Sequence, residues 1–333
     1  MPDQPSIAFV LVTDGSFETC RRTTGYLRNQ TIASEIELII VGPSKEEMAV
    51  DYDFLTPFHS VQVVEFGPVT ITGHASAAGV RVAEAEFVAY AEEHDYPPET
   101  LAETALAKLR EGYPAVGWAL TNANPGLVSW AHLCLQFAPG VYPVPSGEVP
   151  RLTGHHAAYR KDMLLDYGDQ LPDLMSSENV LQMDLHARGE KLFMCGDVAS
   201  AHVHVSNPWN LIMLEFYAQR GFAGVRIEVS GWGWPMRLLY ALGSPLIPFK
   251  RTGIALEALR RDPERSKAMM PQIVPVMFGV AVAGAVGEAI GYLFGGKEAS
   301  YEKTNKFETD RFAFVAKRDK TPKLAVGADT QGH

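Results

Sequence analysis

Hydrophobic and polar positions in the first part of the chain form two kinds of segment. Apolar runs at residues 6–13 and 35–42 have no polar face, which is typical of strands covered on both sides of a sheet. Residues 17–31, between them, carry a mixed pattern that predicts a helix, preceded by a turn whose Asp14 or Ser16 can cap it. The chain therefore opens with a β-α-β unit.

The same alternation continues toward the middle of the chain. We expect further strands at residues 61–66, 87–91 and 115–122, and helices at 75–85 and 99–112. Strands and helices that alternate at this length form a doubly wound, mostly parallel α/β sheet. Such sheets bind ligands at the carboxyl ends of their strands. The predicted fold class is therefore α/β, with its site at that edge.

Composition fits a folded protein and excludes some functions. Of the 333 residues, 47% are hydrophobic and 20% are charged, as in globular chains. A formal net charge of -10 argues against nucleic acid as the main partner, because phosphate binding needs a basic surface. The three widely spaced cysteines form no C-x-x-C motif and suggest a reducing compartment. The first residues lack the features of a signal peptide, so we expect a cytoplasmic protein.

An apolar segment near the C-terminus resembles a membrane span in composition. Residues 273–294 are mostly apolar, but Pro275 and Glu288 interrupt them, whereas a span needs about 20 apolar residues. We expect a helix that does not span a bilayer and buries its apolar side against protein, a lipid surface or a second copy of the chain. Residues 232–251 mix tryptophans and cations with apolar residues, which fits an interfacial element or an amphipathic helix on the core. Peripheral attachment to the inner face of the cell membrane and a homo-oligomer therefore stay open.

Titratable side chains gather directly after the strand predicted at residues 87–91. Glu92, Glu93 and His94 follow it, and a pair of prolines then stops the strand from continuing. Such a group is an ordinary polar exit in many loops. At the carboxyl edge of a parallel sheet it is also the place for a metal or phosphate site.

Over residues 5–225 the chain resembles the family-2 glycosyltransferases of the GT-A type, an α/β fold that binds nucleotide sugars. The segments that carry the resemblance are, in chain order, residues 28–44, the acidic motif at 92–94, the loop at 152–164, the Ser177-Glu178 pair with the helix after it, and residues 197–204 with their histidines. The family's acidic motif is D-x-D, and here it reads Glu-Glu-His.

The resemblance implies an inverting transferase that moves a sugar from a nucleoside diphosphate to an acceptor hydroxyl. It implies a divalent metal, Mn²⁺ or Mg²⁺, at Glu92, His94 and His202 or His204, because a cation stabilises the departing diphosphate. It places Glu178 where the family has its catalytic base. An acid at a helix N-terminus is favoured in its ionised form, so capping the helix is the alternative role.

The resemblance implies further residues on the donor and acceptor sides. Donor or nucleotide binding is expected of Thr13, Asp14, Glu93 and Arg220. Acceptor binding is expected of Trp130, His155 and His156. If Glu178 is a cap, the base lies among Asp173, Asp184 and the two adjacent histidines. A lipid-linked or cell-envelope glycan is the acceptor that the apolar C-terminal segment suggests.

The expected organisation has three parts. Residues 1–225 form the nucleotide-sugar-binding and catalytic domain, 226–316 a helical appendage that contacts a membrane or oligomerises, and 317–333 a disordered tail. A catalytically degenerate binding or scaffold protein with this fold is an alternative, favoured by the Glu-Glu-His motif. A nicotinamide-dependent oxidoreductase fits less well, because the first β-α turn lacks G-x-G-x-x-G.

Overall fold

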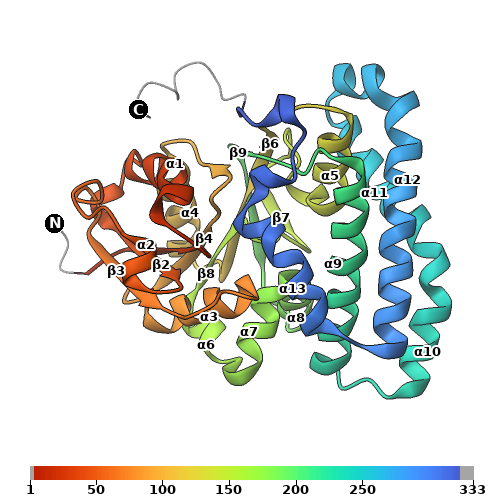
Figure 1. Ribbon diagram of the computed structural model, residues 1–333, viewed down its shortest axis with the longest axis horizontal. Coiled ribbons are helices and arrows are strands. Elements are labelled where there is room, and N and C mark those ends of the chain that lie inside the picture. Colours follow the sequence, from red (N-terminus) through yellow and green to blue (C-terminus); the bar gives the residue numbers. More distant parts are fainter. Residues whose placement is uncertain (1–3, 323–333) are drawn as a thin grey trace. The chain divides into compact units, whose positions relative to one another are not determined.

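The computed structural model describes residues 4–322, which divide into two compact units (Figure 1). Among these residues the first unit comprises 4–121 and 144–202, and the second comprises 122–143 and 203–322. The catalytic domain and appendage predicted on either side of residue 225 stay predictions. Most of the tail predicted to be disordered, 317–333, lies outside the described residues.

A mixed β-sheet forms the core of the first unit. Within the described residues it has nine strands in the order β3-β2-β1-β4-β8-β6-β9-β5, with β7 paired to β9. The strands are β1 (Ile7–Val12), β2 (Ile36–Gly42), β3 (Ser60–Glu65), β4 (Phe87–Ala91), β5 (Asp95–Tyr96), β6 (Ala115–Asn122), β7 (Gly147–Val149), β8 (Ala157–Arg160) and β9 (Leu192–His202). β1 to β4 pair in parallel, and β8 runs antiparallel to both β4 and β6. The predicted mostly parallel α/β sheet is confirmed.

Helices cover both faces of this sheet (Figure 1). They are α1 (Phe17–Arg28), α2 (Lys45–Met48), α3 (Thr72–Val82), α4 (Leu101–Arg110), α6 (Lys161–Leu165), α7 (Leu171–Ser176) and α8 (Glu178–Ala187). In α1 the buried residues Phe17, Cys20, Thr24 and Leu27 are three or four positions apart, so they form one stripe that packs on the protein interior. The helices predicted at 17–31, 75–85 and 99–112 correspond to α1, α3 and α4.

The chain reverses its winding direction between β1 and β4. β1 leads through α1 to β2 on one side of the sheet, and β3 leads through α3 to β4 on the other side of β1. Ligands of doubly wound sheets bind at such a switch point, outside the carboxyl ends of the strands. Thr13 and Asp14 follow β1, whereas Glu92 and Glu93 follow β4, so the topology brings these two segments to the same edge.

The second unit is helical. Its helices are α5 (Leu127–Gln136), α9 (Pro208–Val229), α10 (Trp234–Gly243), α11 (Ile247–Arg260), α12 (Pro263–Phe294) and α13 (Lys297–Thr309). The helix predicted at 273–294 is confirmed as part of α12, which runs through Pro271 and Pro275 without ending. By length and composition α12 is able to cross a membrane, and 44% of its most apolar window is buried inside the protein.

Glycines let α12 approach α9 backbone to backbone. A Cβ atom added to Gly287 would lie 2.1 Å from the carbonyl oxygen of Phe216, and one added to Gly291 would lie 2.6 Å from that of Arg220. Real Cβ atoms do not come this close, so these positions require glycine. The C-terminal half of α12 therefore packs directly against the backbone of α9.

Candidate functional site

Three histidine rings surround one carboxylate oxygen at the carboxyl edge of the sheet. The Oε2 atom of Glu92 lies 3.0 Å from His202 Nε2, 3.3 Å from His94 Nε2 and 3.7 Å from His156 Nε2. All three imidazoles are buried, and the Glu92 side chain is 13% exposed. The ring centroids of His94 and His156 are 4.6 and 4.7 Å from that of His202. The predicted convergence of Glu92, His94 and His202 is confirmed.

Strand pairing holds these residues together. After β4 the chain turns, with Asp95 N–H donating to the carbonyl of Glu92 at 3.1 Å, and enters β5. β5 runs antiparallel to β9, and this register sets Asp95 opposite His202. His156 directly precedes β8, which is antiparallel to β4, so the start of β8 lies beside the end of β4. Three segments distant in sequence therefore meet at one point.

Hydrogen bonds fix the orientation of the cluster. The Nδ1 atom of His156 lies 2.9 Å from the carbonyl oxygen of Gly154, which only accepts, so Nδ1 carries the proton and Nε2 points toward Glu92. Asp95 accepts a hydrogen bond from the hydroxyl of Ser200, and its Oδ2 lies 3.9 Å from His156 Nε2. Burial raises the pKa of Asp95 to about 7, with the Ser200 hydrogen bond opposing it. Asp95 directly follows Glu92, Glu93 and His94 in the sequence, but it was not expected to be a site residue.

The donor set fits a divalent metal ion. Within the described residues Glu92, His94 and His202 form a group whose candidate ligand atoms lie within 4.8 Å of one another. Imidazole nitrogen and carboxylate oxygen are both metal ligands, and here two buried imidazoles stand beside a carboxylate that is only partly exposed. The residues present therefore suit a metal centre at the place where the sequence predicts one.

Glu178 lies buried at the first position of α8. Its Oε2 accepts a hydrogen bond from the backbone N–H of His155, and its Oε1 lies 3.9 Å from His155 Nδ1. Burial raises the pKa of Glu178 above its ordinary value, and His155 opposes only part of that rise. The expectation that the helix terminus favours the ionised form is wrong here, because desolvation outweighs it.

A short loop connects Glu178 with the histidine cluster. Residues 153–156 place His155 against Glu178 and the next residue, His156, against Glu92. His155 has a left-handed backbone conformation (φ 60°), which turns the two adjacent side chains in different directions. The pair predicted to act together on the acceptor side is thus divided between two parts of the site.

Asp173 and Asp184, the alternative bases, have partners elsewhere in the first unit. Asp184 accepts a hydrogen bond from Tyr167 at 2.6 Å and pairs with Arg188 at 2.7 Å. Asp173 lies 3.6 Å from His74 Nε2. Of the three candidate carboxyl bases, Glu178, Asp173 and Asp184, Glu178 is the buried one with a raised pKa.

The predicted donor-side residues of the first unit lie near the switch point. Thr13 is buried, its N–H donates to the Val41 carbonyl at 2.9 Å, and its hydroxyl accepts from Gly15 N–H at 3.2 Å. Asp14 is the next residue after it. Glu93 is buried, with Oε1 3.7 Å from His94 Nδ1. Their roles in nucleotide binding stay predictions.

Three predicted site residues belong to the second unit. His204 packs its ring against His132 and Phe137, at centroid distances of 5.2 and 5.6 Å. Trp130 is half-buried under the guanidinium of Arg265, 4.3 Å from the ring centroid. Arg220 donates to the carbonyl of Gly295 at 3.0 Å, at the end of α12. These contacts give each residue a structural role, and their predicted roles at the site stay predictions.

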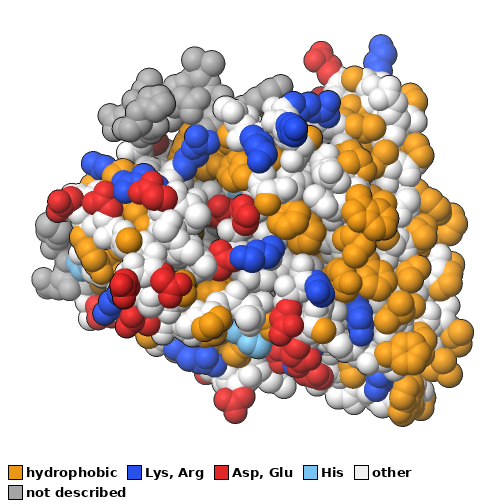
Figure 2. Space-filling model, in the orientation of Figure 1, with side chains coloured by type: hydrophobic (Ala, Val, Ile, Leu, Met, Phe, Trp, Pro, Cys, Tyr) orange, Lys and Arg blue, Asp and Glu red, His pale blue; other side chains and the backbone are white. Residues whose placement is uncertain are grey.

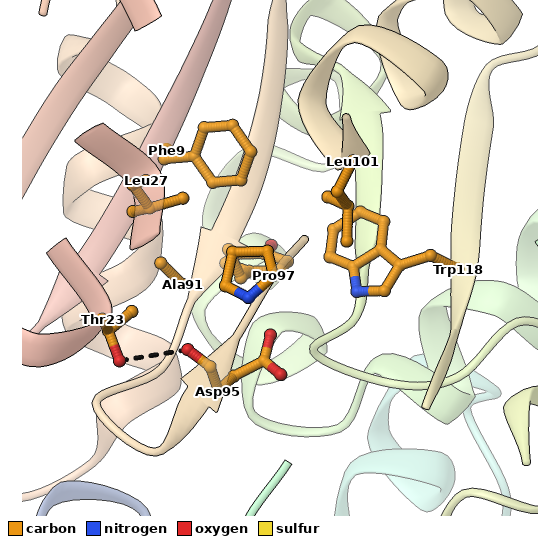
Figure 3. A pocket seen from close by; sticks show the side chains of 9 residues that line it. Phe9, Thr23, Leu27, Ala91, Asp95, Pro97, Leu101 and Trp118 are labelled. Atoms are coloured by element: carbon orange, nitrogen blue, oxygen red, sulfur yellow. Dashed lines mark hydrogen bonds between the residues drawn. The ribbon is translucent and has the colours of Figure 1, made fainter. Parts of the chain in front are cut away.

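A small cavity lies beneath the site, between β1, β4, α1 and α4 (Figure 3). It is lined by Phe9, Leu27, Trp118 and other residues, and Thr23 donates to the backbone carbonyl of Asp95 at its edge. Its volume of about 10 Å³ has room for one water molecule. This cavity is far too small for a nucleotide, so a donor has to bind outside it.

Comparison with known proteins shows a likeness of fold. No protein-family model and no curated protein matches the chain. Among solved structures, TarS from S. aureus matches with a TM-score of 0.50 and 15% identity, over 86% of this chain and 55% of that one. Residues 1–349 of S. aureus TarS in complex with UDP match with a TM-score of 0.48 and 15% identity, over 90% of this chain and 91% of that one.

The fold places the chain among α/β proteins of the GT-A type. The mostly parallel sheet, its switch point between β1 and β4, and the helices that follow agree with the architecture expected from the sequence. At 15% identity the likeness is one of fold, so activity has to be argued from the site.

Proposed function

We propose that this protein is a metal-dependent, inverting glycosyltransferase that moves a sugar from a nucleoside diphosphate donor to an acceptor hydroxyl. The observation that carries the proposal is the pairing of two features at one sheet edge. One is the Glu92, His94 and His202 cluster, and the other is a buried carboxyl group of raised pKa, Glu178, joined to it by the loop at 153–156.

In this proposal the metal cluster stabilises the leaving group, the nucleoside diphosphate. Glu92, His94 and His202 would hold a divalent cation, which supplies positive charge to the diphosphate as its bond to the sugar breaks. Thr13 and Asp14, which follow β1, would contact the nucleotide at the switch point. The donor would thus be held by the metal and by residues of the first unit that follow β1 and β4, Glu93 among them.

In this proposal Glu178 is the base that takes the proton of the acceptor hydroxyl. A carboxylate with a raised pKa is a stronger base than an exposed one, so it accepts the proton of the acceptor hydroxyl more readily. The backbone N–H of His155 holds one of its oxygens in place, and the other oxygen remains to receive the proton. Attack by the hydroxyl on the face of the sugar opposite the diphosphate gives inversion in a single displacement.

We also propose that the second unit binds an anionic membrane surface. Its exposed apolar side chains include Trp234, Leu239, Leu242, Leu246 and Phe249, all from α10, α11 and the segment between them. Figure 2 shows hydrophobic side chains gathered on the side where Figure 1 places α10 to α12.

Charge supports a lipid surface as the occupant of this apolar face. The chain has a net charge of -10, yet residues 229–256 contain no acidic residue. Lys250 is exposed in this segment and Arg237 is half-buried over the ring of Trp234, whereas Arg251 is paired with the buried Glu215. Apolar side chains with cations and tryptophans among them suit the headgroup region of anionic lipids. An acceptor carried by the same membrane, such as a lipid-linked glycan, would then lie within reach of the enzyme.

Donor binding tests the proposed activity first. Thermal shifts are measured with UDP-, GDP- and TDP-sugars, each with and without Mn²⁺, and we expect one nucleotide class to stabilise the protein when metal is present. For that donor, proton NMR of the first sugar released by slow hydrolysis should show the anomer opposite to the donor's. The same anomer as in the donor would contradict inversion. Binding without any hydrolysis or transfer would favour the degenerate binding protein.

A further inference from the structure

We propose that the imidazole of His155 relays the proton of the acceptor hydroxyl to Glu178. The inference rests on the transferase proposed above and names the side chain that meets the acceptor. In this step the hydroxyl proton binds Nε2 of His155, while the proton on Nδ1 passes to Oε1 of Glu178. The electron pair left on the hydroxyl oxygen forms the bond to the anomeric carbon of the sugar, and the bond from that carbon to the diphosphate breaks.

Glu178 is too deeply buried to meet an acceptor by itself. Its side chain is 1% exposed, and its Oε2 accepts a hydrogen bond from the backbone N–H of His155. Its Oε1 is buried and has no hydrogen-bond partner among the residues that the structure describes. Burying a carboxyl oxygen without a partner is costly, and such atoms are rare in folded proteins. An acceptor hydroxyl therefore needs a group that connects it to this oxygen.

The side chain of His155 lies where such a group is needed. It is 34% exposed, and its Nδ1 lies 3.9 Å from Oε1 of Glu178. Its ring meets the ring of Tyr90 edge-on, with the centroids 6.4 Å apart. Tyr90 is part of β4, two positions before Glu92. One imidazole is thus accessible from solvent, next to the buried carboxyl group and close to the carboxyl end of β4.

The distance between the two side chains suits a pair that closes when the acceptor binds. A separation of 3.9 Å is about 1 Å longer than a hydrogen bond, and catalytic hydrogen bonds are often long until the substrate is in place. Burial raises the pKa of Glu178 and the charge of His155 opposes that rise, so the two groups already interact. A buried carboxylate that orients a more exposed imidazole is also the arrangement of the Ser-His-Asp triad.

Two tyrosines also face Glu178, and neither can take the place of His155. Burial and, after it, the charge of Glu178 raise the pKa of Tyr90 and of Tyr159 well above the ordinary value, so both phenols stay protonated. Both hydroxyl groups also have hydrogen-bond partners other than Glu178. Imidazole, in contrast, is the side chain that ordinarily gains and loses a proton near neutral pH.

The backbone at His155 allows the side chain to be removed without loss of the fold. Its left-handed conformation (φ 60°) is unfavourable for most side chains, whereas Gly and Asn adopt it readily. A histidine in such a conformation points to a role of the imidazole itself. His155→Asn and His155→Gly keep the backbone N–H that binds Glu178, so both variants should fold with a Tm close to that of the wild type.

Turnover of these variants tests the relay. It is measured as release of nucleoside diphosphate from a donor that the wild type cleaves, with water as the acceptor. We expect kcat about 10²–10⁴-fold lower in His155→Asn and His155→Gly, with the donor KM nearly unchanged. The control His186→Asn, exposed on the same helix as Glu178, should match the wild type.

Added imidazole separates a relay from a structural role. It should restore part of the kcat of His155→Gly, which lacks the side chain, and should not raise that of Glu178→Gln. Normal turnover by His155→Asn, or a loss in His155→Gly that imidazole leaves unchanged, would overturn the relay alone. Failure of the wild type to cleave any donor would overturn the transferase itself.

The pKa of Glu178 tests the pair without reference to activity. It is measured from the ¹³C signal of the side-chain carboxyl group, which is assigned by its absence in Glu178→Gln. Because the charge of His155 opposes the rise that burial causes, the pKa of Glu178 should be higher in His155→Asn than in the wild type. Equal pKa values in the two proteins would overturn the relay.

Discussion

His202 Nε2 lies 3.0 Å from Glu92 Oε2, although 110 positions separate the two residues in the chain. The contact depends on the pairing of β5 with β9, which sets Asp95 opposite His202. It joins the end of β4 to the end of β9 at the sheet edge where doubly wound folds bind ligands. This relationship makes a metal centre possible and supports placing the donor diphosphate there.

We expect Glu178→Gln to lower turnover by about 10²–10⁴-fold with donor affinity nearly unchanged, the usual value of a positioned base. Glutamine keeps the size of the side chain and can still accept the hydrogen bond from His155, but it cannot accept a proton. Steady-state kinetics with an identified donor should show the loss in kcat and not in KM. Normal turnover by the variant would make Glu178 a structural residue only.

The same substitution should increase stability at neutral pH. Burial raises the pKa of Glu178 in the folded protein above its ordinary value in the unfolded chain. The folded wild type is therefore most stable below the ordinary pKa, where Glu178 is protonated in both states, and it loses stability as the pH rises through the raised pKa. Glutamine does not ionise, so the difference in Tm between variant and wild type should grow from about pH 4 to pH 8. A variant that is less stable at every pH would contradict the cost assigned to the buried charge.

Two glycines of α12 provide a matched test of the packing against α9. Gly287→Ala places a methyl group against the Phe216 carbonyl and should destabilise the protein by about 1–3 kcal/mol, as overpacking does. Gly279 lies in the same helix with open space around it, so Gly279→Ala should be neutral or stabilise by up to about 1 kcal/mol. Thermal or urea unfolding separates the two, and equal shifts would mean that α12 does not pack closely at Gly287.

Membrane docking depends on the exposed leucines of the second unit. Leu242→Asp or Leu246→Asp should weaken binding to vesicles that contain phosphatidylglycerol about tenfold or more, because burying one leucine in lipid is worth about 1.5–3 kcal/mol. Leu165→Asp changes an exposed leucine of α6 in the first unit and serves as the control. Vesicle flotation measures the difference.

Other outcomes of that experiment decide against the lipid surface. If the wild type floats equally well with neutral lipids and is unaffected by salt, charge plays no part. If it ignores vesicles and forms a dimer that Leu242→Asp dissociates, the apolar face binds a second copy of the chain. Extraction only by detergent would contradict the expectation that α12 does not span the bilayer.

The sequence was sufficient for the parallel strands and for β6 because these strands are apolar runs bounded by turns, whereas the antiparallel strands β5, β7, β8 and β9 were not predicted. β1, β2, β4 and β6 all lie where those runs predicted them. A site residue was predictable where it directly follows a parallel strand, because that position puts it at the carboxyl edge of the sheet. Glu92 after β4 is such a residue. These features need only local pattern and the rule that ligands meet the carboxyl edge of a parallel sheet.

The other features of the site depend on backbone geometry, which the pattern of hydrophobic and polar residues does not predict. His202 and His204 are two positions apart and would share a face on a longer strand, but β9 ends at His202 and His204 continues into the second unit. His155 and His156 are adjacent, yet the left-handed conformation of His155 sends them to different partners. Neither the end of a strand nor the twist of a loop follows from residue type.

Metal-dependent cleavage of a nucleotide sugar tests the central claim most directly. The wild type is incubated with each donor of the UDP, GDP and TDP panel, with Mn²⁺ or Co²⁺ or after treatment with a chelator, and the released nucleoside diphosphate is measured. We predict release from at least one donor, loss of that release with chelator, and loss in Glu92→Gln. Failure to cleave any donor in the panel with either metal, or cleavage that neither chelator nor Glu92→Gln affects, would contradict the account.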